Sequence, residues 1–213
     1  MREQTIELIK RHKVISIVRG IPLDSMRKLA EALMRGGINL IEVTFAQDAP
    51  ECWQDTCESI KLLNTMGIRA GAGTVITLEQ LEMAKDAGAR YIISPNADED
   101  IIRATRSMNL VSIPGALTPT EIVHAYNWGA DFVKVFPVST LGSAYIKAVS
   151  APLKHIPLLA VGGITADNMG EFLKAGCKGV GVGGNLANAK LIAQGRFDLI
   201  EQCAASYAAQ VNT

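Results

Sequence analysis

The stretch PLLAVGGI at residues 157–164 shows the unit that repeats along this chain. Its first five residues are almost all apolar, as in a short buried strand, and a pair of glycines follows them. A helix-type pattern then runs to Gly176, and a second apolar run with two glycines, GVGVGG, begins at residue 179. The two runs start about 20 residues apart, which is the length of one strand, one helix and two short loops. The stretch therefore predicts two parallel strands joined by a helix.

Runs of this kind occur along the whole chain. Eight apolar runs rich in valine and isoleucine lie at residues 13–18, 39–44, 68–72, 91–94, 110–113, 131–136, 157–161 and 179–182. The segments between them carry helix signals: Thr77, Thr118 and Thr165 stand as N-caps, and each of these three segments stops at a glycine. Strand and helix in alternation predict parallel strands joined by right-handed crossovers.

We therefore expect a (β/α)8 barrel, the TIM-barrel fold, formed as one domain by residues 1–213. The main alternative is an open doubly wound sheet, but no GxGxxG motif follows the first run, where that fold carries it. The first dozen residues are expected to form a short extra helix that closes the N-terminal face of the barrel. Chemistry in this fold belongs at the C-terminal ends of the strands.

The composition argues against several classes of function. Twenty-one basic and twenty-one acidic residues give a net charge of zero, which argues against a nucleic-acid partner. No apolar stretch reaches the ~18 residues of a membrane helix, and residues 1–13 lack the apolar core of a secretory signal. The four cysteines and three histidines show no zinc-type spacing, so free thiols and no metal are expected. We expect a cytoplasmic protein whose partner is a small molecule.

Lys134 interrupts FVKVF at residues 132–136, a run that otherwise reads as a fully buried strand. A buried ammonium must be paired, reach water or lose its proton. A lysine with a lowered pKa is what Schiff-base chemistry needs, because only the neutral amine attacks a ketone. The alternative is a lysine that points to the outer helices and extends its ammonium to solvent, in which case Lys147 is the rival reactive lysine.

Glu42 raises the same question in the run 39–44. Strand alternation places Leu40, Glu42 and Thr44 on one face. An inward Glu42 would contact Lys134 across the barrel and relay protons. The alternative is a purely structural ion pair between the two side chains.

Two glycine turns end the last two strands, at residues 162–163 and 183–184, and a helix is expected to start behind each. Backbone N–H groups of such turns hold phosphate in many barrels. No P-loop lysine follows, which argues against a nucleoside triphosphate. The alternative is a pair of tight turns that bind nothing.

An ordered set of motifs supports a more specific interpretation. The motifs are IVRGI at 17–21, IEVT at 41–44, GAGT at 71–74, SPN at 94–96, IPG at 113–115, VKVFP at 133–137, AVGGI at 160–164 and GVGG at 181–184. In this order and spacing they resemble the 2-keto-3-deoxy-6-phosphogluconate / 4-hydroxy-2-oxoglutarate aldolases, the KDPG/KHG aldolase family. The resemblance covers nearly the whole chain.

The resemblance implies a class I aldolase on a (β/α)8 barrel, a homotrimer that needs no metal or cofactor. Such an enzyme cleaves a 2-keto-3-deoxy-6-phospho-sugar acid or 4-hydroxy-2-oxoglutarate to pyruvate and an aldehyde, glyceraldehyde 3-phosphate or glyoxylate. By resemblance Lys134 is the Schiff-base lysine, and Glu42 is the acid/base that works through a water. Contacts to the substrate are implied for Arg19, Thr74, Pro95 and Phe136. Backbone N–H groups implied to hold the distal phosphate belong to Gly162, Gly163, Gly184 and Asn185.

Three departures from the family pattern bear on the substrate. Many members follow IEVT with an arginine that binds the substrate carboxylate, whereas this chain continues with FAQ at 45–47. Arg19 and Thr74 are the nominated replacements. Val161 stands where the gluconate branch usually has threonine, and Asn185 stands where serine is common. The missing arginine, Val161 and the IVRGI motif point to the branch that acts on 2-keto-3-deoxy-6-phosphogalactonate.

Two rival classes also fit a phosphate-binding barrel. A non-covalent sugar-phosphate epimerase or isomerase would need metal ligands or a second base, which three scattered histidines do not provide. A catalytically silent binding barrel would have no reason to keep buried charges at Lys134 and Glu42, because unpaired buried charges are costly.

Overall fold

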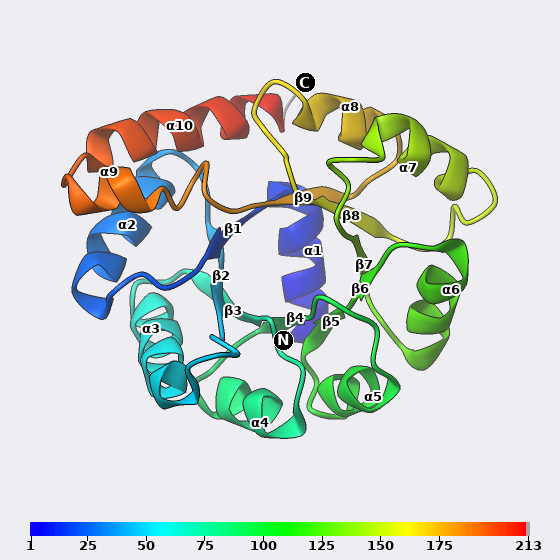
Figure 1. Ribbon diagram of the computed structural model, residues 1–213, viewed down its shortest axis with the longest axis horizontal. Helices are drawn as coiled ribbons and strands as arrows, with labels where there is room; N and C mark the ends of the chain where they lie inside the picture. The colour runs from blue at the N-terminus through cyan, green and yellow to red at the C-terminus, as the bar shows by residue number, and fades with distance from the viewer. Residues whose placement is uncertain (212–213) are drawn as a thin grey trace.

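Parallel strands form a closed barrel with helices around it (Figure 1). The computed structural model describes residues 1–211. Within these residues nine strands form one sheet in the order β5-β4-β3-β2-β1-β9-β8-β7-β6. The strands are β1 Val14–Val18, β2 Leu40–Thr44, β3 Arg69–Gly73, β4 Tyr91–Ile93, β5 Val111–Ile113, β6 Gly115–Ala116, β7 Val133–Val135, β8 Leu158–Val161 and β9 Gly179–Val182. The predicted (β/α)8 barrel is confirmed, with one difference in its strands.

That difference is an additional two-residue strand, β6, which follows the fifth predicted strand after Pro114; the predicted run 110–113 itself corresponds to β5. Proline has no N–H to donate to a neighbouring strand, so the ladder is interrupted there. β5 pairs with β4, and β6 pairs with β7, with Gly115 opposite Lys134. The carbonyl of Pro114 still accepts a hydrogen bond from the Lys134 N–H at 2.8 Å. The short segment 111–116 therefore closes the barrel, because its first half pairs with β4 and its second half pairs with β7.

Helices follow the strands as the sequence patterns predict. They are α1 Arg2–His12, α2 Leu23–Arg35, the 3-10 turn η1 Pro50–Cys52, α3 Trp53–Thr65, α4 Leu78–Asp86, α5 Glu99–Ser107, α6 Pro119–Trp128, α7 Gly142–Ser150, α8 Met169–Lys174, α9 Ala189–Ala193 and α10 Phe197–Gln210. The predicted N-caps Thr77 and Thr118 are confirmed, since each side chain accepts the backbone N–H three residues further on.

Thr165 accepts the N–H three residues further on as predicted, but it caps a turn that precedes the helix, because α8 begins only at Met169 with Asn168 at the N-cap position. Thr165 and Asn168 exchange two hydrogen bonds between side chain and backbone, at 2.9 and 3.2 Å. This closed turn satisfies the polar groups that a helix start would otherwise need, and it delays the helix by one turn.

The predicted N-terminal helix is confirmed as α1, which lies across the centre of the barrel in Figure 1. Ile6 and Ile9 are its buried apolar side chains, and they pack against the side chains that fill the barrel interior. Those interior residues are Ile15, Leu40, Tyr91, Ile93, Val111, Ile113, Phe132 and Leu159. α1 therefore closes the N-terminal face and leaves the opposite face open for a site.

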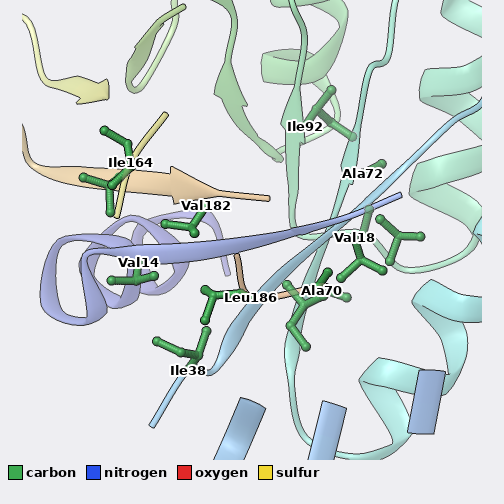
Figure 2. Packing of buried hydrophobic residues seen from close by; sticks show 14 of the residues in the cluster. Val14, Val18, Ile38, Ala70, Ala72, Ile92, Ile164, Val182 and Leu186 are labelled. Carbon is green, nitrogen blue, oxygen red and sulfur yellow. The ribbon is translucent and has the colours of Figure 1, made fainter. Parts of the chain in front are cut away.

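A second apolar layer lies between the strands and the surrounding helices. Figure 2 shows part of it, with Val14 of β1 near Val182 of β9, and Val18 at the other end of β1 on the side of Ala70 and Ala72 of β3. These side chains alternate along each strand with those of the interior cluster. The alternation determines which side chains can reach the interior, and so which can take part in a site.

Asp131 joins several elements at the closed end of the barrel. Its carboxylate is 4% exposed and accepts hydrogen bonds from Arg2 Nε of α1 at 3.2 Å and from Arg106 Nη1 of α5 at 2.7 Å. It also accepts the N–H of Ser112 in β5 at 3.0 Å. One buried carboxylate thus connects the N-terminal helix, an outer helix and the segment that closes the barrel.

Asp131→Ala is expected to lower the free energy of unfolding by about 2–3 kcal/mol, because hydrogen bonds to a charged, buried group are lost together. Urea denaturation at neutral pH measures this change. Asp198→Ala is the matched control: its ion pair with Arg196 is exposed, so no measurable change is expected. Equal denaturation midpoints for wild type and Asp131→Ala would show that the carboxylate does not stabilise the fold.

Candidate active site

A cavity of about 540 Å³ opens at the C-terminal ends of β1, β7, β8 and β9. This is the end of the barrel at which the sequence predicted chemistry. The predicted site residues that line the cavity are Arg19, Phe136, Gly162, Gly163, Gly184 and Asn185. Four predicted site residues do not line it: Lys134, Glu42, Thr74 and Pro95. Thr74 and Pro95 lie after the more distant strands β3 and β4.

Lys134 lies in the barrel interior, so the alternative in which it points to the outer helices is wrong. Its side chain is on the same face of the strand as Phe132, which belongs to the interior cluster, and the residue is only 8% exposed. Nζ lies 4.7 Å from the centre of the Phe136 ring, which forms part of the cavity wall. Burial lowers the pKa of Lys134. The negative charge of Glu42 raises this pKa in part, and the positive charge of Arg19 lowers it further. The environment therefore favours the neutral amine beside the cavity.

Glu42 also points inward and is 2% exposed. Its carboxylate occupies the space over Gly73 of β3, where a Cβ atom would overlap it. Burial raises the pKa of Glu42, and the positive charges of Lys134 and Arg19 partly offset the rise. Oε2 is buried and has no hydrogen-bond partner in the part of the chain that the structure describes. A buried carboxylate without a partner is costly, which is typical of a functional group.

The interpretation of Glu42 and Lys134 as a structural ion pair is wrong. The two groups influence each other's pKa, yet within residues 1–211 they form no ion pair at or below 4.0 Å. β2 and β7 stand on opposite sides of the barrel, with β3, β4, β5 and β6 between them on one side and β1, β9 and β8 on the other. The carboxylate of Glu42 and the amine of Lys134 thus both point into the barrel interior without forming an ion pair.

Glycines in β3 create the space for this arrangement. A Cβ atom at Gly71 would overlap the ring of Tyr91, just as one at Gly73 would overlap Glu42. Sequence reasoning missed this role, although a glycine inside a strand is a recognised sign of close approach. The GAG part of the GAGT motif therefore shapes the interior and accommodates side chains from β2 and β4.

Thr74 and Arg19 lie at the open end of the barrel. Thr74 has a φ of 56°, an uncommon value for a residue other than glycine, and its carbonyl accepts a hydrogen bond from Gln47 Nε2 at 2.8 Å. Arg19 is exposed, and its charge reaches both Glu42 and Lys134. Pro95 is exposed and packs against Gly115, which is the strand partner of Lys134.

The glycine turns after β8 and β9 face the cavity. Gly162 and Gly163 have φ values of 104° and 69°, and their loop meets the turn that contains Gly184. The N–H groups of Gly163, Gly184 and Asn185 donate to no protein group within residues 1–211. They are therefore available to an anion.

Helices do not begin directly behind these turns, as the sequence had indicated, because α8 starts at Met169 and α9 at Ala189. The Asn185 side chain is also engaged: Nδ2 donates to the Ile164 carbonyl at 3.1 Å and to the Tyr207 hydroxyl at 3.2 Å. Asn185 and Tyr207 thus hold the two loops together, and the amide of the Asn185 side chain is not available to an anion.

The sequence profile of the family described as "KDPG and KHG aldolase" matches residues 5–203. The chain belongs to this family. It is 34% identical over 179 residues to the 2-dehydro-3-deoxy-6-phosphogalactonate aldolase of Escherichia coli K12, covering 83% of this chain and 85% of that protein. It is 32% identical over 200 residues to a 2-dehydro-3-deoxy-phosphogluconate aldolase of Treponema pallidum, covering 91% of each.

Solved structures of the KDPG/KHG aldolase family share the fold. One called "Native KDPGal structure" has a TM-score of 0.83 at 30% identity, over 93% of this chain and 94% of that chain. The KDPG aldolase of Legionella pneumophila, with pyruvate captured as a covalent carbinolamine, has a TM-score of 0.85 at 28% identity, over 95% and 97%. The protein is thus a class I aldolase, and the non-covalent epimerase and silent-barrel alternatives are set aside.

No helix within residues 1–211 is both long and apolar enough to cross a membrane. In the same part of the chain, no three His, Cys, Asp or Glu side chains gather in a way that would hold a metal ion.

Proposed function

We propose that this aldolase cleaves 2-keto-3-deoxy-6-phosphogalactonate to pyruvate and glyceraldehyde 3-phosphate, with Lys134 as the Schiff-base residue and Glu42 as the acid/base. The observation that carries the proposal is the buried, unpaired Lys134 beside the cavity, with the unpartnered Glu42 in the same interior. The identity of 34% to the phosphogalactonate aldolase of Escherichia coli supports this choice of substrate.

The chemistry follows from the two environments. Burial favours the neutral amine of Lys134, which adds to the C2 ketone and forms a carbinolamine that loses water to give a protonated imine. Glu42 in its ionised form accepts the proton of the C4 hydroxyl, and the C3–C4 bonding electrons move into the imine. The aldehyde leaves, the enamine is protonated at C3, and water hydrolyses the imine to release pyruvate and Lys134.

In this proposal the carboxylate and the phosphate of the substrate bind to different residues at the open face of the barrel. Arg19 and Thr74 receive the keto-acid carboxylate, because no cation follows β2: Phe45 is buried and Gln47 is hydrogen-bonded to the backbone. Pro95 and Phe136 form walls of the site. The distal phosphate meets the N–H groups of Gly162, Gly163, Gly184 and Asn185.

The wider setting is proposed from the family alone. In this proposal the enzyme is a cytoplasmic homotrimer of carbohydrate metabolism whose partners are small keto acids and phosphorylated aldehydes. Sedimentation equilibrium tests the trimer: a mass of one or two chains at micromolar concentration would contradict it.

Borohydride reduction in the presence of pyruvate tests the mechanism. Reduction makes an imine permanent, and peptide mapping of the product is expected to place the adduct on Lys134. Because the pKa of Lys134 is lowered, trapping is expected to extend to lower pH than it would on an exposed lysine, and to decline as the amine becomes protonated. An adduct on the exposed Lys147 would contradict the assignment, and no adduct on any lysine would contradict class I chemistry in this chain.

Turnover assays with stereoisomeric substrates test the specificity. We expect kcat/KM to be highest for 2-keto-3-deoxy-6-phosphogalactonate and lower for the gluconate isomer and for 4-hydroxy-2-oxoglutarate. Equal values for the phosphorylated and unphosphorylated substrates would contradict the role of the glycine turns.

A further inference from the structure

A pair of glutamine side chains connects the loops that follow β2 and β3. Gln47 Nε2 donates to the carbonyl of Thr74 at 2.8 Å and to that of Phe45 at 3.3 Å. Gln80, in the first turn of α4, donates its own Nε2 to Gln47 Oε1 at 3.0 Å. Its Oε1 accepts the N–H of Ile76 at 2.8 Å. The side-chain amides of Gln47 and Gln80 thus form a continuous chain of hydrogen bonds from α4 to the loop after β2.

The inner member of the pair is rigidly held. Gln80 is fully buried, and its own N–H is bound by the Thr77 side chain at 3.1 Å. Gln47 is exposed overall, but both of its amide atoms are used by the contacts just described. A buried and satisfied amide gives the exposed one a fixed orientation.

The residue at the end of this chain of contacts is Thr74, whose φ is 56°. Residues other than glycine disfavour this left-handed backbone conformation, so it persists only where contacts with the surrounding residues stabilise it. Gln47 contacts the Thr74 carbonyl, whose direction depends on that conformation. The hydrogen bond is therefore suited to keep Thr74 in its left-handed state.

The same conformation presents free donors at the barrel rim. Thr74 directly follows Gly73, against which the Glu42 carboxylate packs. Neither the N–H nor the hydroxyl of Thr74 donates to any group in residues 1–211. Two donors next to the acid/base are suited to an anionic carboxylate.

We propose that Gln47, oriented by Gln80, is a positioning residue that keeps Thr74 in the conformation that binds the carboxylate of the α-keto acid. The proposal rests on the assignment of Thr74 to the carboxylate end of the substrate. It explains what the segment Phe45–Gln47 after β2 contributes in place of a cation: the Gln47 amide fixes the turn at Thr74, which binds the carboxylate together with Arg19.

The test compares two carbonyl compounds that differ in this carboxylate. Pyruvate and acetone both form imines, and acetone carries a methyl group in place of the carboxylate. Borohydride trapping on Lys134 is measured for both in the wild type and in Gln47→Met, which keeps the length of the side chain and removes its donor. Gln202→Met, at an exposed position of α10, is the matched control.

In Gln47→Met we expect the efficiency of pyruvate trapping to fall about five- to tenfold, while acetone trapping changes less than about twofold. With a phosphorylated substrate, KM is expected to rise while kcat stays nearly constant, and Gln202→Met leaves every value unchanged. An equal fall for pyruvate and acetone, or no fall for either, would overturn the proposal. If wild-type protein fails to trap pyruvate, the proposed function itself is wrong, which is a distinct result.

Discussion

Lys134→Met is expected to lose at least about 10⁴-fold in turnover while the barrel remains folded, because no other nucleophile can form the imine. Methionine matches the length of the lysine side chain and carries no charge. The wild-type lysine is buried without an ion pair, so its removal leaves no partner unsatisfied. Aldehyde release from a 2-keto-3-deoxy-6-phospho acid, followed by a coupled assay, measures the loss.

Two comparisons make this result decisive. Circular dichroism and thermal unfolding should show a native barrel in Lys134→Met, with a midpoint no lower than that of wild type. Lys147→Met removes an exposed lysine of α7 and is expected to keep full turnover. Wild-type turnover in Lys134→Met would refute the covalent role of this residue.

Gly73→Ala is expected to lower kcat about 100-fold, although residue 73 has no side chain to contribute to chemistry. A methyl group at this position would overlap the Glu42 carboxylate, so the acid/base must move away from its place over β3. Displacement of a catalytic group by about 1 Å is enough for a loss of this size. Steady-state kinetics with the preferred substrate measures it.

Gly170→Ala is the control for this substitution. A Cβ atom at Gly170 would meet only Gln210 Oε1, at 3.8 Å, which is an ordinary contact, and the residue lies inside α8. We expect unchanged kcat and equal or higher stability there, since alanine favours a helix. If Gly73→Ala keeps wild-type kcat while folding normally, the position of Glu42 is not important for the reaction.

Much of the fold could be predicted because its signals are local. The apolar runs at 13–18 and 39–44 correspond to Val14–Val18 and Leu40–Thr44. Glycine stops and threonine caps act within a few residues, so they are visible in the sequence. The extra strand β6 after Pro114 was not predicted, because it forms by pairing with β7, whose residues are distant in sequence. The start of α8 at Met169 was also not predicted.

The site was predictable as a set of residues but not as an arrangement. Alternation within β7 allowed Lys134 to face either way; the packing of Phe132 into the interior cluster decides between the two. The contact of Glu42 with Gly73 depends on the cross-strand register of β2 and β3. The bridge from Gln47 to Gln80 joins side chains that are 33 positions apart, and no local pattern reveals it.

The glycine gap in β3 has a consequence for the resting enzyme. Because the Glu42 carboxylate lies over Gly73, it rests against the strand beside its own, and Lys134 belongs to a strand across the barrel. The Glu42 carboxylate and the Lys134 amine are thereby kept apart, and they form no ion pair within residues 1–211. An incoming keto acid then meets an amine that is already free, and no salt link has to be broken before the first bond forms.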